Sequence, residues 1–324
     1  MNKQPLISIL VCNYNYGRYI EECLNSAYQQ DYPNIEIVVV DDGSTDNSID
    51  VINGFIKSKQ KNNIKIELRQ KKKNQGICYA RNDAIALAKG EYFVFLDSDD
   101  IIAEDYVSRL YSTAIKKNAD VVYCDMESFG STTSVSNFPS YDQSELLIHN
   151  YVHISSLVRA LAIGTHSFDV ALNRKSLEDY DFWVGLSLKD LNFVKADGVV
   201  LHYRVQEESR NSNTASYLDR MSEALDAWIY IISKYQKEYP TKIKEGIVFD
   251  KLKYQVKDIS TELNRINSIV HEDLLPELAK REKHINYLDE QLQEQLQKLN
   301  STEYKIGIQL MAPLRKVKSI FKKI

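Results

Sequence analysis

The stretch GEYFVFLDSDD, residues 90–100, joins an apolar run to a cluster of three carboxylates. Residues Phe93–Leu96 predict a buried strand, and Asp97, Asp99 and Asp100 follow where that strand leaves its sheet. Carboxylates that lose water without gaining a partner are costly, so these three need compensation. In open α/β sheets, ligands bind beyond the carboxyl ends of the strands. The stretch therefore predicts an enzyme that holds a hard divalent cation and a phosphorylated substrate at this edge.

The same acids are also typical of a solvated turn or of the start of a helix, where Asp and Ser are common. An EF-hand calcium loop, in contrast, is excluded. Counted from Asp97, Ile102 stands where such a loop requires glycine, and Ser108 stands where it requires a bidentate Glu. The rest of the chain must decide between the turn and the metal site.

The first 130 residues alternate between β-type and helical patterns. Apolar runs typical of strands are Leu6–Cys12, Ile35–Val40, Ile64–Leu68 and Ala119–Asp125. Helical spacing connects the runs, in Gly17–Gln30, Ile49–Ile56, Ile77–Ala88 and Tyr106–Lys117. This succession predicts an α/β, Rossmann-like fold with a mainly parallel sheet and helices on both faces.

The pattern becomes less regular beyond Ser131. The polar segment Ser131–Asp142 predicts a loop, and Val199–Val205 predicts a short strand. Leu146–Leu161 and Ser176–Leu191 have the spacing of helices. We expect this half to complete the same domain.

Length and composition are those of a globular protein with segments beyond one large domain. The chain has 324 residues, of which 44% are hydrophobic, and its net charge of −4 argues against general nucleic-acid binding. Cys12, Cys23, Cys78 and Cys124 have no paired spacing, so we expect small buried side chains in a reduced compartment. The first apolar run is too short for a membrane span and lacks the layout of a signal peptide. A cytoplasmic location is therefore predicted.

From Tyr217 on, the sequence predicts helices. A heptad seam with alternating spacings of four and three is formed by Leu252, Val256, Ile259, Leu263, Ile266 and Val270. It indicates either a homo-oligomeric coiled coil or a helix folded back on its own domain. In Tyr304–Ile324, apolar residues alternate with six Lys and Arg and no acid. That tail suits the inner, anionic face of the cell membrane, or an acidic protein surface.

Four further segments accompany the acidic cluster in a fixed order. They are Cys12–Asn15, Val39–Ser44, Asn74–Asn82 and Glu178–Trp183. At these points and at the acidic cluster the chain resembles the family 2 glycosyltransferases, over roughly residues 5–210. The resemblance implies a GT-A fold and an inverting transfer of sugar from a UDP- or dTDP-sugar donor. The acceptor would be a hydroxyl of a glycan or of a lipid-linked molecule.

The resemblance assigns residues to the nucleotide base. Tyr14 follows the first strand, where the family stacks an aromatic ring on the base, which is worth on the order of 1–3 kcal/mol. Asp42 would accept a hydrogen bond from the base imide, and the neighbouring Asp41 would anchor the turn. Asn74 falls where the family contacts the nucleotide.

Phosphates and metal are assigned in the same way. Arg81 and Arg204 would contact the diphosphate, because a guanidinium suits phosphate; the alternative for Arg81 is a surface helix arginine. Asp97 and Asp99 match the Asp-x-Asp pair of the family. Asp99 would bind Mg²⁺ or Mn²⁺ directly, and Asp97 would face the ribose or a metal-bound water. The cation would neutralise charge on the departing nucleoside diphosphate.

An inverting transfer also needs a base that takes the proton of the acceptor hydroxyl. Asp179 matches that base of the family. Glu178 is the second candidate or holds Asp179 in place, and Asp181 is the third. Asp181 is also explained as a charge at the start of a helix.

The chain departs from the pattern of the family near its later Tyr-Arg motif. Gln206 stands where a His often follows, so a third metal ligand of that type is not expected there. His202 is the substitute in reach, although a lone His beside a strand is more often structural.

These observations predict three parts: a GT-A domain at 1–214, a helical region with heptads at 215–300 and a basic amphipathic tail at 301–324. Two other functions fit parts of the sequence. A nucleotidyltransferase shares the sheet but needs a Gly-rich phosphate loop, where this chain has Asn13–Arg18. A catalytically inactive scaffold subunit would use the helical region alone. No nucleic acid partner is expected.

Overall fold

We describe a computed structural model of the chain. It describes residues 4–59, 64–206, 217–235, 237, 268, 271–272 and 275–297. The chain divides into two compact units, Met1–Leu252 and Lys253–Ile324, which are treated separately.

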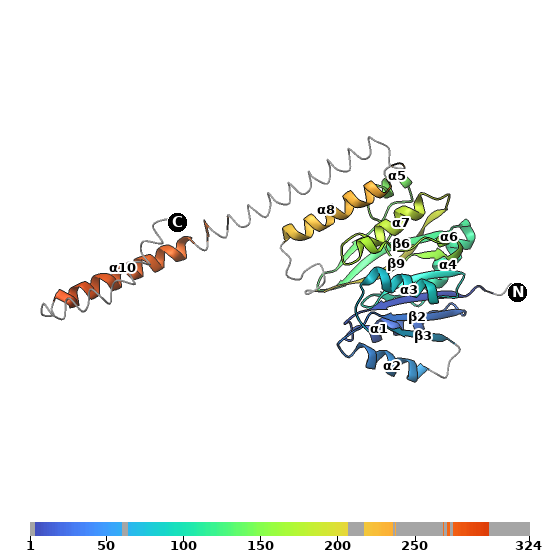
Figure 1. The fold of residues 1–324 in the computed structure, drawn as a ribbon, viewed down its shortest axis with the longest axis horizontal. Coiled ribbons are helices and arrows are strands. Elements are labelled where there is room, and N and C mark those ends of the chain that lie inside the picture. The colour runs from blue at the N-terminus through green and yellow to red at the C-terminus, as the bar shows by residue number, and fades with distance from the viewer. Residues whose placement is uncertain are drawn as a thin grey trace. The chain divides into compact units, whose positions relative to one another are not determined.

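The first unit begins with four parallel strands. β1 (Ile7–Asn13) lies between β2 (Ile35–Asp41) and β4 (Tyr92–Asp97), and β3 (Lys65–Gln70) forms the edge beyond β2. The apolar runs of β1, β2 and β4 are buried on both faces, as is typical of strands covered by helices, whereas the edge strand β3 is only partly buried. The connecting helices are α1 (Ile20–Tyr28), α2 (Ser48–Lys59), α3 (Ile77–Leu87) and, after β4, α4 (Tyr106–Lys117). The predicted α/β succession is confirmed here, and Figure 1 shows its layers.

Beyond β4 the sheet becomes mixed. β8 (Leu157–Arg159) runs antiparallel to β4 on one side and to β6 (Val121–Gly130) on the other. β6 then pairs in parallel with β9 (Phe193–Val205), whose far edge carries the short antiparallel β5 (Ile101–Ile102). A last strand, β7 (Ser134–Ser136), pairs with β6. The predicted mainly parallel sheet therefore holds for the first half, and the whole is a mixed sheet of nine strands.

One helix prediction is wrong. Leu146–Leu161 is not a helix: α5 (Gln143–Leu146) ends where it should begin, and the segment then supplies β8 and α6 (Ala160–Ile163). Short apolar runs do not distinguish helix from strand. Here Leu157–Arg159 forms a strand because it lies between β4 and β6. The rest of this half is η1 (Val170–Leu172) and α7 (Glu178–Ser187).

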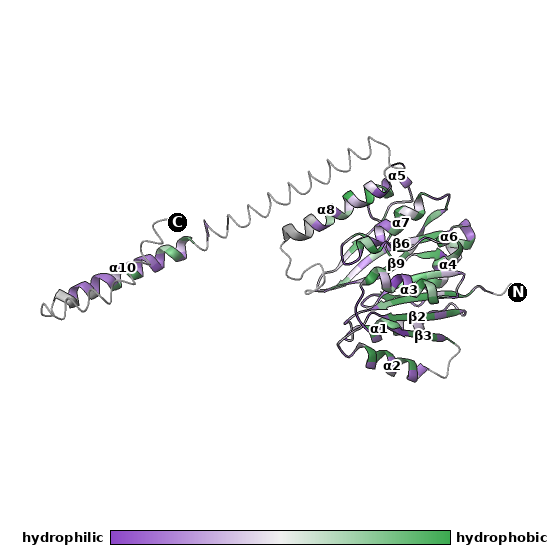
Figure 2. Cartoon of the chain, in the orientation of Figure 1, coloured by the Kyte–Doolittle hydropathy of each residue, from purple (hydrophilic) through white to green (hydrophobic). Residues whose placement is uncertain are grey.

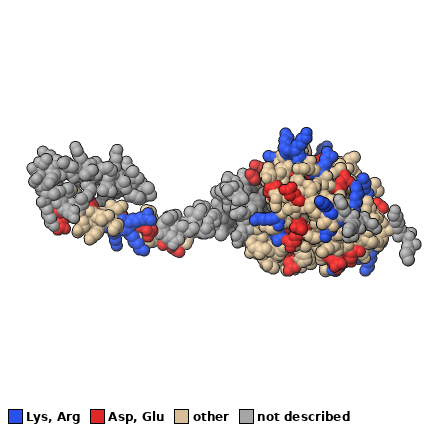
Figure 3. Space-filling view, turned by 90° about the horizontal axis from the view of Figure 1, so that it is seen from below, with Lys and Arg blue, Asp and Glu red and all other residues tan. Residues whose placement is uncertain are grey.

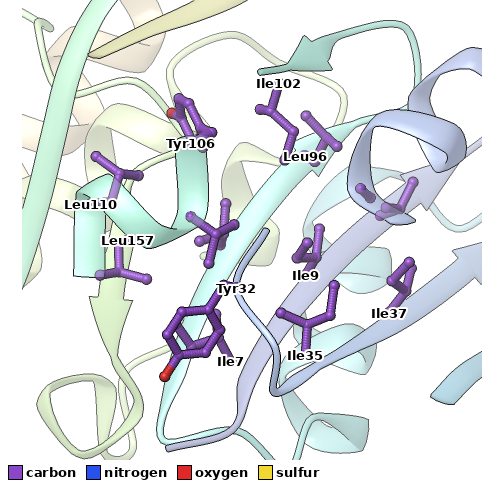
Figure 4. Packing of buried hydrophobic residues seen from close by; sticks show 14 of the residues in the cluster. Ile7, Ile9, Tyr32, Ile35, Ile37, Leu96, Ile102, Tyr106, Leu110 and Leu157 are labelled. Carbon is purple, nitrogen blue, oxygen red and sulfur yellow. The ribbon is translucent and has the colours of Figure 1, made fainter. Parts of the chain in front are cut away.

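Helices cover both faces of the sheet, as predicted. On one face, Ile20 of α1, Phe55 of α2 and Leu110 of α4 pack against strand residues such as Ile9 and Ile37. Figure 4 shows Tyr106 and Leu110 beside the strand of Leu96, in the same apolar cluster as Ile9 and Ile37. On the other face, α3 and α7 contribute Ala84 and Phe182. Figure 2 shows the hydrophobic colour concentrated in the strands. All four cysteines are buried and unbonded to one another, as their spacing predicted.

A further helix, α8 (Tyr217–Lys234), packs on α7 through a third apolar cluster. The second unit contains α10 (Leu275–Gln297), whose exposed apolar residues are Leu275, Leu278, Tyr287 and Leu288. The heptad seam from Leu252 to Val270 and the basic tail lie outside the described residues. Among the helices that are described, none combines the length and the apolarity needed to traverse a lipid bilayer.

Candidate active site

The carboxyl ends of the parallel strands bring the predicted polar residues to one edge of the sheet. In the strand register, Asn13 at the end of β1 lies opposite Asp41 at the end of β2. On the other side of β1, Cys12 lies opposite Asp97 at the end of β4. Residues far apart in the sequence therefore meet where a ligand of an open α/β sheet is expected.

Asp41 anchors the turn after β2, as predicted. Its Oδ2 accepts hydrogen bonds from Asn13 Nδ2 at 2.8 Å and from the Ser44 hydroxyl at 2.6 Å. Its Oδ1 accepts from the backbone N–H of Ser44 at 2.9 Å. Asp41 is fully buried, and these donors compensate its charge.

Asp42 ties this turn to the loop before α3. Its carboxylate accepts from the N–H groups of Gln75 at 3.1 Å and Gly76 at 2.6 Å, and it lies 2.9 Å from Lys71 Nζ. Only 3% of Asp42 is exposed, so a base imide would have to share this carboxylate with its present donors. Gly43 makes the close approach feasible, because its φ is +78° and a Cβ there would lie 2.6 Å from the backbone of Lys73.

A second loop, which contains Asn173 and Arg174, forms hydrogen bonds with Asn74 and its neighbours. Arg174 Nη2 donates to the backbone carbonyl of Asn74 at 3.1 Å and to its Oδ1 at 3.0 Å. Asn173 Nδ2 donates to the Gln75 carbonyl at 2.6 Å, and Asn173 Oδ1 accepts from Cys78 N–H at 3.2 Å. Asn74 is thus fixed from outside by a segment a hundred residues away in the sequence.

The Arg81 guanidinium links the acidic cluster to α7. Its Nη2 donates to Asp97 Oδ1 at 3.0 Å, and its Nη1 donates to Glu178 Oε1 at 3.1 Å. Burial lowers the pKa of Arg81, but the charges of Asp97 and Glu178 outweigh it, so the pKa lies above its usual value. With only 5% of its side chain exposed, Arg81 is a buried bridge rather than a surface arginine.

Asp99 and Asp100 are held by the end of β9. Gln206 Nε2 donates to Asp99 Oδ2 at 2.6 Å, and the backbone N–H of Arg204 donates to Asp100 Oδ1 at 2.8 Å. Arg204 Nε also donates to the Asp99 carbonyl at 2.8 Å, and its guanidinium pairs with Glu22. The position where the family often has His therefore contacts the acidic cluster through an amide.

The donor set of this cluster fits a divalent cation that is completed by phosphate. Burial raises the pKa of Asp99 to about 6, and the charge of Asp97 adds to the rise. The charge of Asp99 is thus incompletely neutralised by the residues around it. Among the described residues, no three His, Cys, Asp or Glu side chains converge as a metal site. Mg²⁺ commonly takes one or two carboxylates together with substrate phosphates and water. Asp97 and Asp99 can supply the carboxylates.

The two acids at the start of α7 have different environments. Glu178 is paired with Arg81, whereas Asp179 Oδ1 accepts from Asn150 Nδ2 at 3.5 Å and from the N–H of Tyr180 at 2.7 Å. Burial raises the pKa of Asp179 to about 6, the charge of Glu178 raises it further, and Arg81 opposes the rise. A carboxylate with this pKa can accept a proton near neutral pH.

Asp181, the third candidate base, belongs to a different contact. Its side chain is fully buried and lies 2.8 Å from Lys234 Nζ of α8. Lys234 also lies 2.8 Å from Asp169, whose Oδ2 accepts from the Tyr230 hydroxyl as well. This contact fixes α8 against α7. No local sequence pattern marks this contact, because Asp181 and Lys234 lie 53 residues apart along the chain.

Two other predicted residues lie beside the network. Tyr14 follows β1 with 39% of its surface exposed, so its ring is accessible at the same edge. His202 on β9 has its Nδ1 3.7 Å from the Glu127 carboxylate. The residues that sequence reasoning missed are Arg174 and Lys234. Gln206 was noticed only as a departure from the family pattern.

A family model described as Glycosyl transferase family 2 matches residues 8–180 of this chain. Glycosyltransferase GlyG of Streptococcus pneumoniae serotype 4 is 40% identical over 147 residues, which are 45% of this chain and 44% of that protein. Poly(ribitol-phosphate) beta-glucosyltransferase of Bacillus spizizenii is 30% identical over 252 residues, 75% of this chain and 39% of that one. The chain thus spans less than half the length of these two curated relatives.

Solved structures share the fold. S. aureus TarS 1–349, in complex with UDP-GlcNAc, superposes with a TM-score of 0.57 at 23% identity over 70% of this chain and 66% of that chain. Mannosyltransferase PcManGT from Pyrobaculum calidifontis, in complex with GDP-Man and Mn²⁺, gives a TM-score of 0.57 at 18% identity over 76% and 69%. At these identities the likeness establishes a GT-A-like fold and nothing finer.

Proposed function

Because this chain belongs to glycosyl transferase family 2, we propose that it transfers a sugar from a UDP- or dTDP-sugar to a hydroxyl of a glycan or lipid-linked acceptor, with inversion at the sugar carbon. The observation that carries the proposal is the single guanidinium of Arg81, shared by Asp97 and Glu178. It joins the acids proposed for the donor to the acids proposed for the acceptor, so both can act on one sugar.

The donor side follows from the carboxyl edge. Tyr14 stacks on the base, and Asp42 accepts from its imide while it holds the loop of Asn74. Arg204, at the end of β9, faces the diphosphate beside Asp99. Arg81 acts on the donor by orienting Asp97, because two of its nitrogens are already engaged by carboxylates.

Asp99, assisted by Asp97, is the residue that would hold Mg²⁺ or Mn²⁺. When bound, the cation offsets the charge that builds up on the departing nucleoside diphosphate. Gln206 keeps the Asp99 carboxylate oriented by its hydrogen bond, and the N–H of Arg204 does the same for Asp100. The similar fold that contains GDP-Man and Mn²⁺ supports this assignment.

On the acceptor side, Asp179 takes the proton of the attacking hydroxyl. Its raised pKa makes it a better base than an ordinary carboxylate, and Asn150 and the N–H of Tyr180 both hold its Oδ1 in place. Glu178 is a positioning residue, since its own oxygen is bonded to Arg81. Attack from this side, opposite the diphosphate, inverts the configuration.

The test is release of nucleotide from a panel of UDP-, dTDP- and GDP-sugars by the full chain with Mn²⁺. Asp99→Asn and Asp179→Asn are expected to lower kcat by about 10²–10⁴-fold, the usual contribution of a positioned base or of charge stabilisation. Asp50→Asn, at an exposed position on α2, is the matched control and should keep full activity.

Three outcomes would point elsewhere. Full activity of Asp179→Asn would move the base to another residue. Release of pyrophosphate from a nucleoside triphosphate would identify a nucleotidyltransferase. Tight binding of UDP and metal without turnover of any donor would identify an inactive subunit.

We also propose two interaction partners for the C-terminal part of the chain, a second copy of the chain and a membrane surface. The heptad seam, outside the described residues, would join copies of the chain, and the basic tail would attach the enzyme to the inner face of the membrane. Sedimentation of the full chain with and without anionic vesicles tests both.

A further inference from the structure

Two loops at the edge of the site carry six cations and no carboxylate. Arg69–Gly76, which leaves β3, contains one Arg and three Lys, and Val170–Leu177, which leads into α7, contains Arg174 and Lys175. The whole chain has a net charge of −4, so this concentration is local. Over most of the face in Figure 3, acidic and basic side chains are interspersed.

The two loops lie side by side. Arg174 Nη2 bonds the carbonyl and the Oδ1 of Asn74, the residue that directly follows Lys73. Asn173 bonds Gln75 and Cys78 in the same way. The guanidinium of Arg174 is therefore held one residue from a second cation.

Five of the six cations are exposed and make no ion pair with any described residue. One is Arg69, which still belongs to β3, and the other four lie in the loops: Lys72, Lys73, Arg174 and Lys175. We call these four residues the cationic rim. Lys71 differs, since it pairs with Asp42 and Asp83. Like charges held close together repel one another, and a bound anion would relieve that repulsion.

The backbone of the second loop is strained. Arg174 has a φ of +63° and Leu177 has a φ of +71°, although neither is glycine. Such residues cost free energy and cluster at ligand-binding and catalytic sites. The loop holds Arg174 on Asn74 and then delivers Glu178 and Asp179 at the start of α7.

This placement assigns the rim to the acceptor. The donor phosphates are proposed to lie at Asp97 and Asp99, on the β4 side of Arg81. The acceptor hydroxyl must meet Asp179, and Arg174 and Lys175 lie five and four residues before it, on the segment that leads directly into α7. A guanidinium matches the oxygens of a phosphate group particularly well.

We propose that the cationic rim binds an acceptor polymer whose repeating units carry phosphodiester groups. This rests on the proposed transferase function and names the class of its acceptor. A relative that is 30% identical over 75% of this chain is named as acting on poly(ribitol-phosphate), which carries such groups.

The experiment measures equilibrium binding of a ribitol-phosphate octamer to the full chain, with glucose and hyaluronan oligomers of equal length as comparisons. Lys72→Gln/Lys73→Gln is compared with Lys116→Gln/Lys117→Gln, which removes two exposed lysines from the end of α4. Arg174→Gln is a third variant. At low salt, the rim pair should weaken octamer binding at least about tenfold, and high salt should reduce this difference.

The variant Lys72→Gln/Lys73→Gln should bind UDP as tightly as the unaltered chain does. The proposal would be overturned if Lys116→Gln/Lys117→Gln weakened octamer binding as much as the rim variant does. It would also be overturned if the chain bound the neutral glucose oligomer as tightly as the octamer, or bound hyaluronan more tightly. A parallel loss of UDP affinity would overturn it too, by assigning these cations to the donor. Nucleotide release from the donor is measured separately. If the octamer binds but no donor is turned over, the proposed transferase function is refuted, whereas binding of the polymer by the cationic rim remains supported.

Discussion

Arg81 couples the acids of two elements, β4 and α7, through one planar group. A guanidinium can serve both because its Nη atoms point in different directions, whereas an ammonium is a compact charge. In this site Asp97 and Glu178 each occupy one Nη, and the third nitrogen, Nε, is buried without a hydrogen-bond partner among the described residues.

We therefore expect Arg81→Lys to impair catalysis even though the charge is kept. Losing one charge-assisted hydrogen bond costs about 1.5 kcal/mol or more, which corresponds to a decrease of about tenfold in kcat. Steady-state kinetics check the decrease, and thermal unfolding of the same sample shows whether the fold is kept. Unchanged kcat in a folded variant would mean that the bridge has no role in the reaction.

The pKa of Asp179 sets a second expectation at this scale. A base acts when it is deprotonated, so a pKa of about 6 predicts that kcat falls about tenfold for each pH unit below 6. Glu178→Gln removes a charge that raises this pKa, so the acid limb should move to lower pH. The profile of kcat from pH 4.5 to 8 measures both. An acid limb that stays in place in Glu178→Gln would assign the titration to another group.

The sequence predicted which polar residues lie at the carboxyl edge of the sheet where they end long apolar runs. Asp42 follows the seven residues of β2, and Asp97 is the last of the six residues of β4, so their place at the carboxyl edge is a consequence of parallel pairing. The contacts of Gln206 with Asp99 and of Lys234 with Asp181 could not be predicted. Their partners lie 107 and 53 residues away, and no local pattern marks them.

At the scale of elements, α8 supports the helix that carries the proposed base. It lies beyond the residues matched by the family model, yet Trp228 and Ile231 pack against Tyr180 and Val184 of α7. Lys234 adds the ion pair with the buried Asp181.

Lys234→Met should destabilise the protein by about 3–5 kcal/mol, because it leaves Asp181 as a buried charge without its partner. The double variant Asp181→Leu/Lys234→Met removes both charges and should recover much of that loss. Urea unfolding of the two variants measures the free energies. A double variant as unstable as the single one would show that packing volume, and not charge, decides.

The short elements are where prediction failed. β8 has three residues and is followed at once by α6, so Leu146–Leu161 reads as one continuous apolar segment. What makes Leu157–Arg159 a strand is the presence of β4 and β6 on either side, which is long-range information. In contrast, Tyr106–Lys117 has enough turns for its period to be unambiguous, and α4 has these bounds.

For the whole molecule, the described part of the first unit is completed by α8. A chain cut after residue 206 would expose Leu147, Leu172, Tyr180 and Val184, which α8 covers. At about 25 cal/mol per Å² of apolar surface, exposing a cluster of this kind costs several kcal/mol. We expect a chain cut there to bind more of a hydrophobic dye and to unfold at lower temperature than one cut after Leu252, the limit of the first unit.

Dye fluorescence and a thermal melt of the two shortened chains check this expectation. Identical melting curves would mean that α8 contributes nothing to the stability of the unit. Nucleotide binding by the chain cut after Leu252 would in addition show that the donor half folds without the second unit.

The reversed direction of β8 has a consequence for how such enzymes diversify. Because β8 lies between β4 and β6 and runs opposite to both, the chain from Ser131 to Leu177 leaves the carboxyl edge of the sheet after β6 and returns to that edge before α7. Outside β8, the connections in this segment can differ in length or charge without shifting the strands whose ends carry Asp41 and Asp97. Enzymes that share this sheet can thus differ in their acceptors while they keep the same donor.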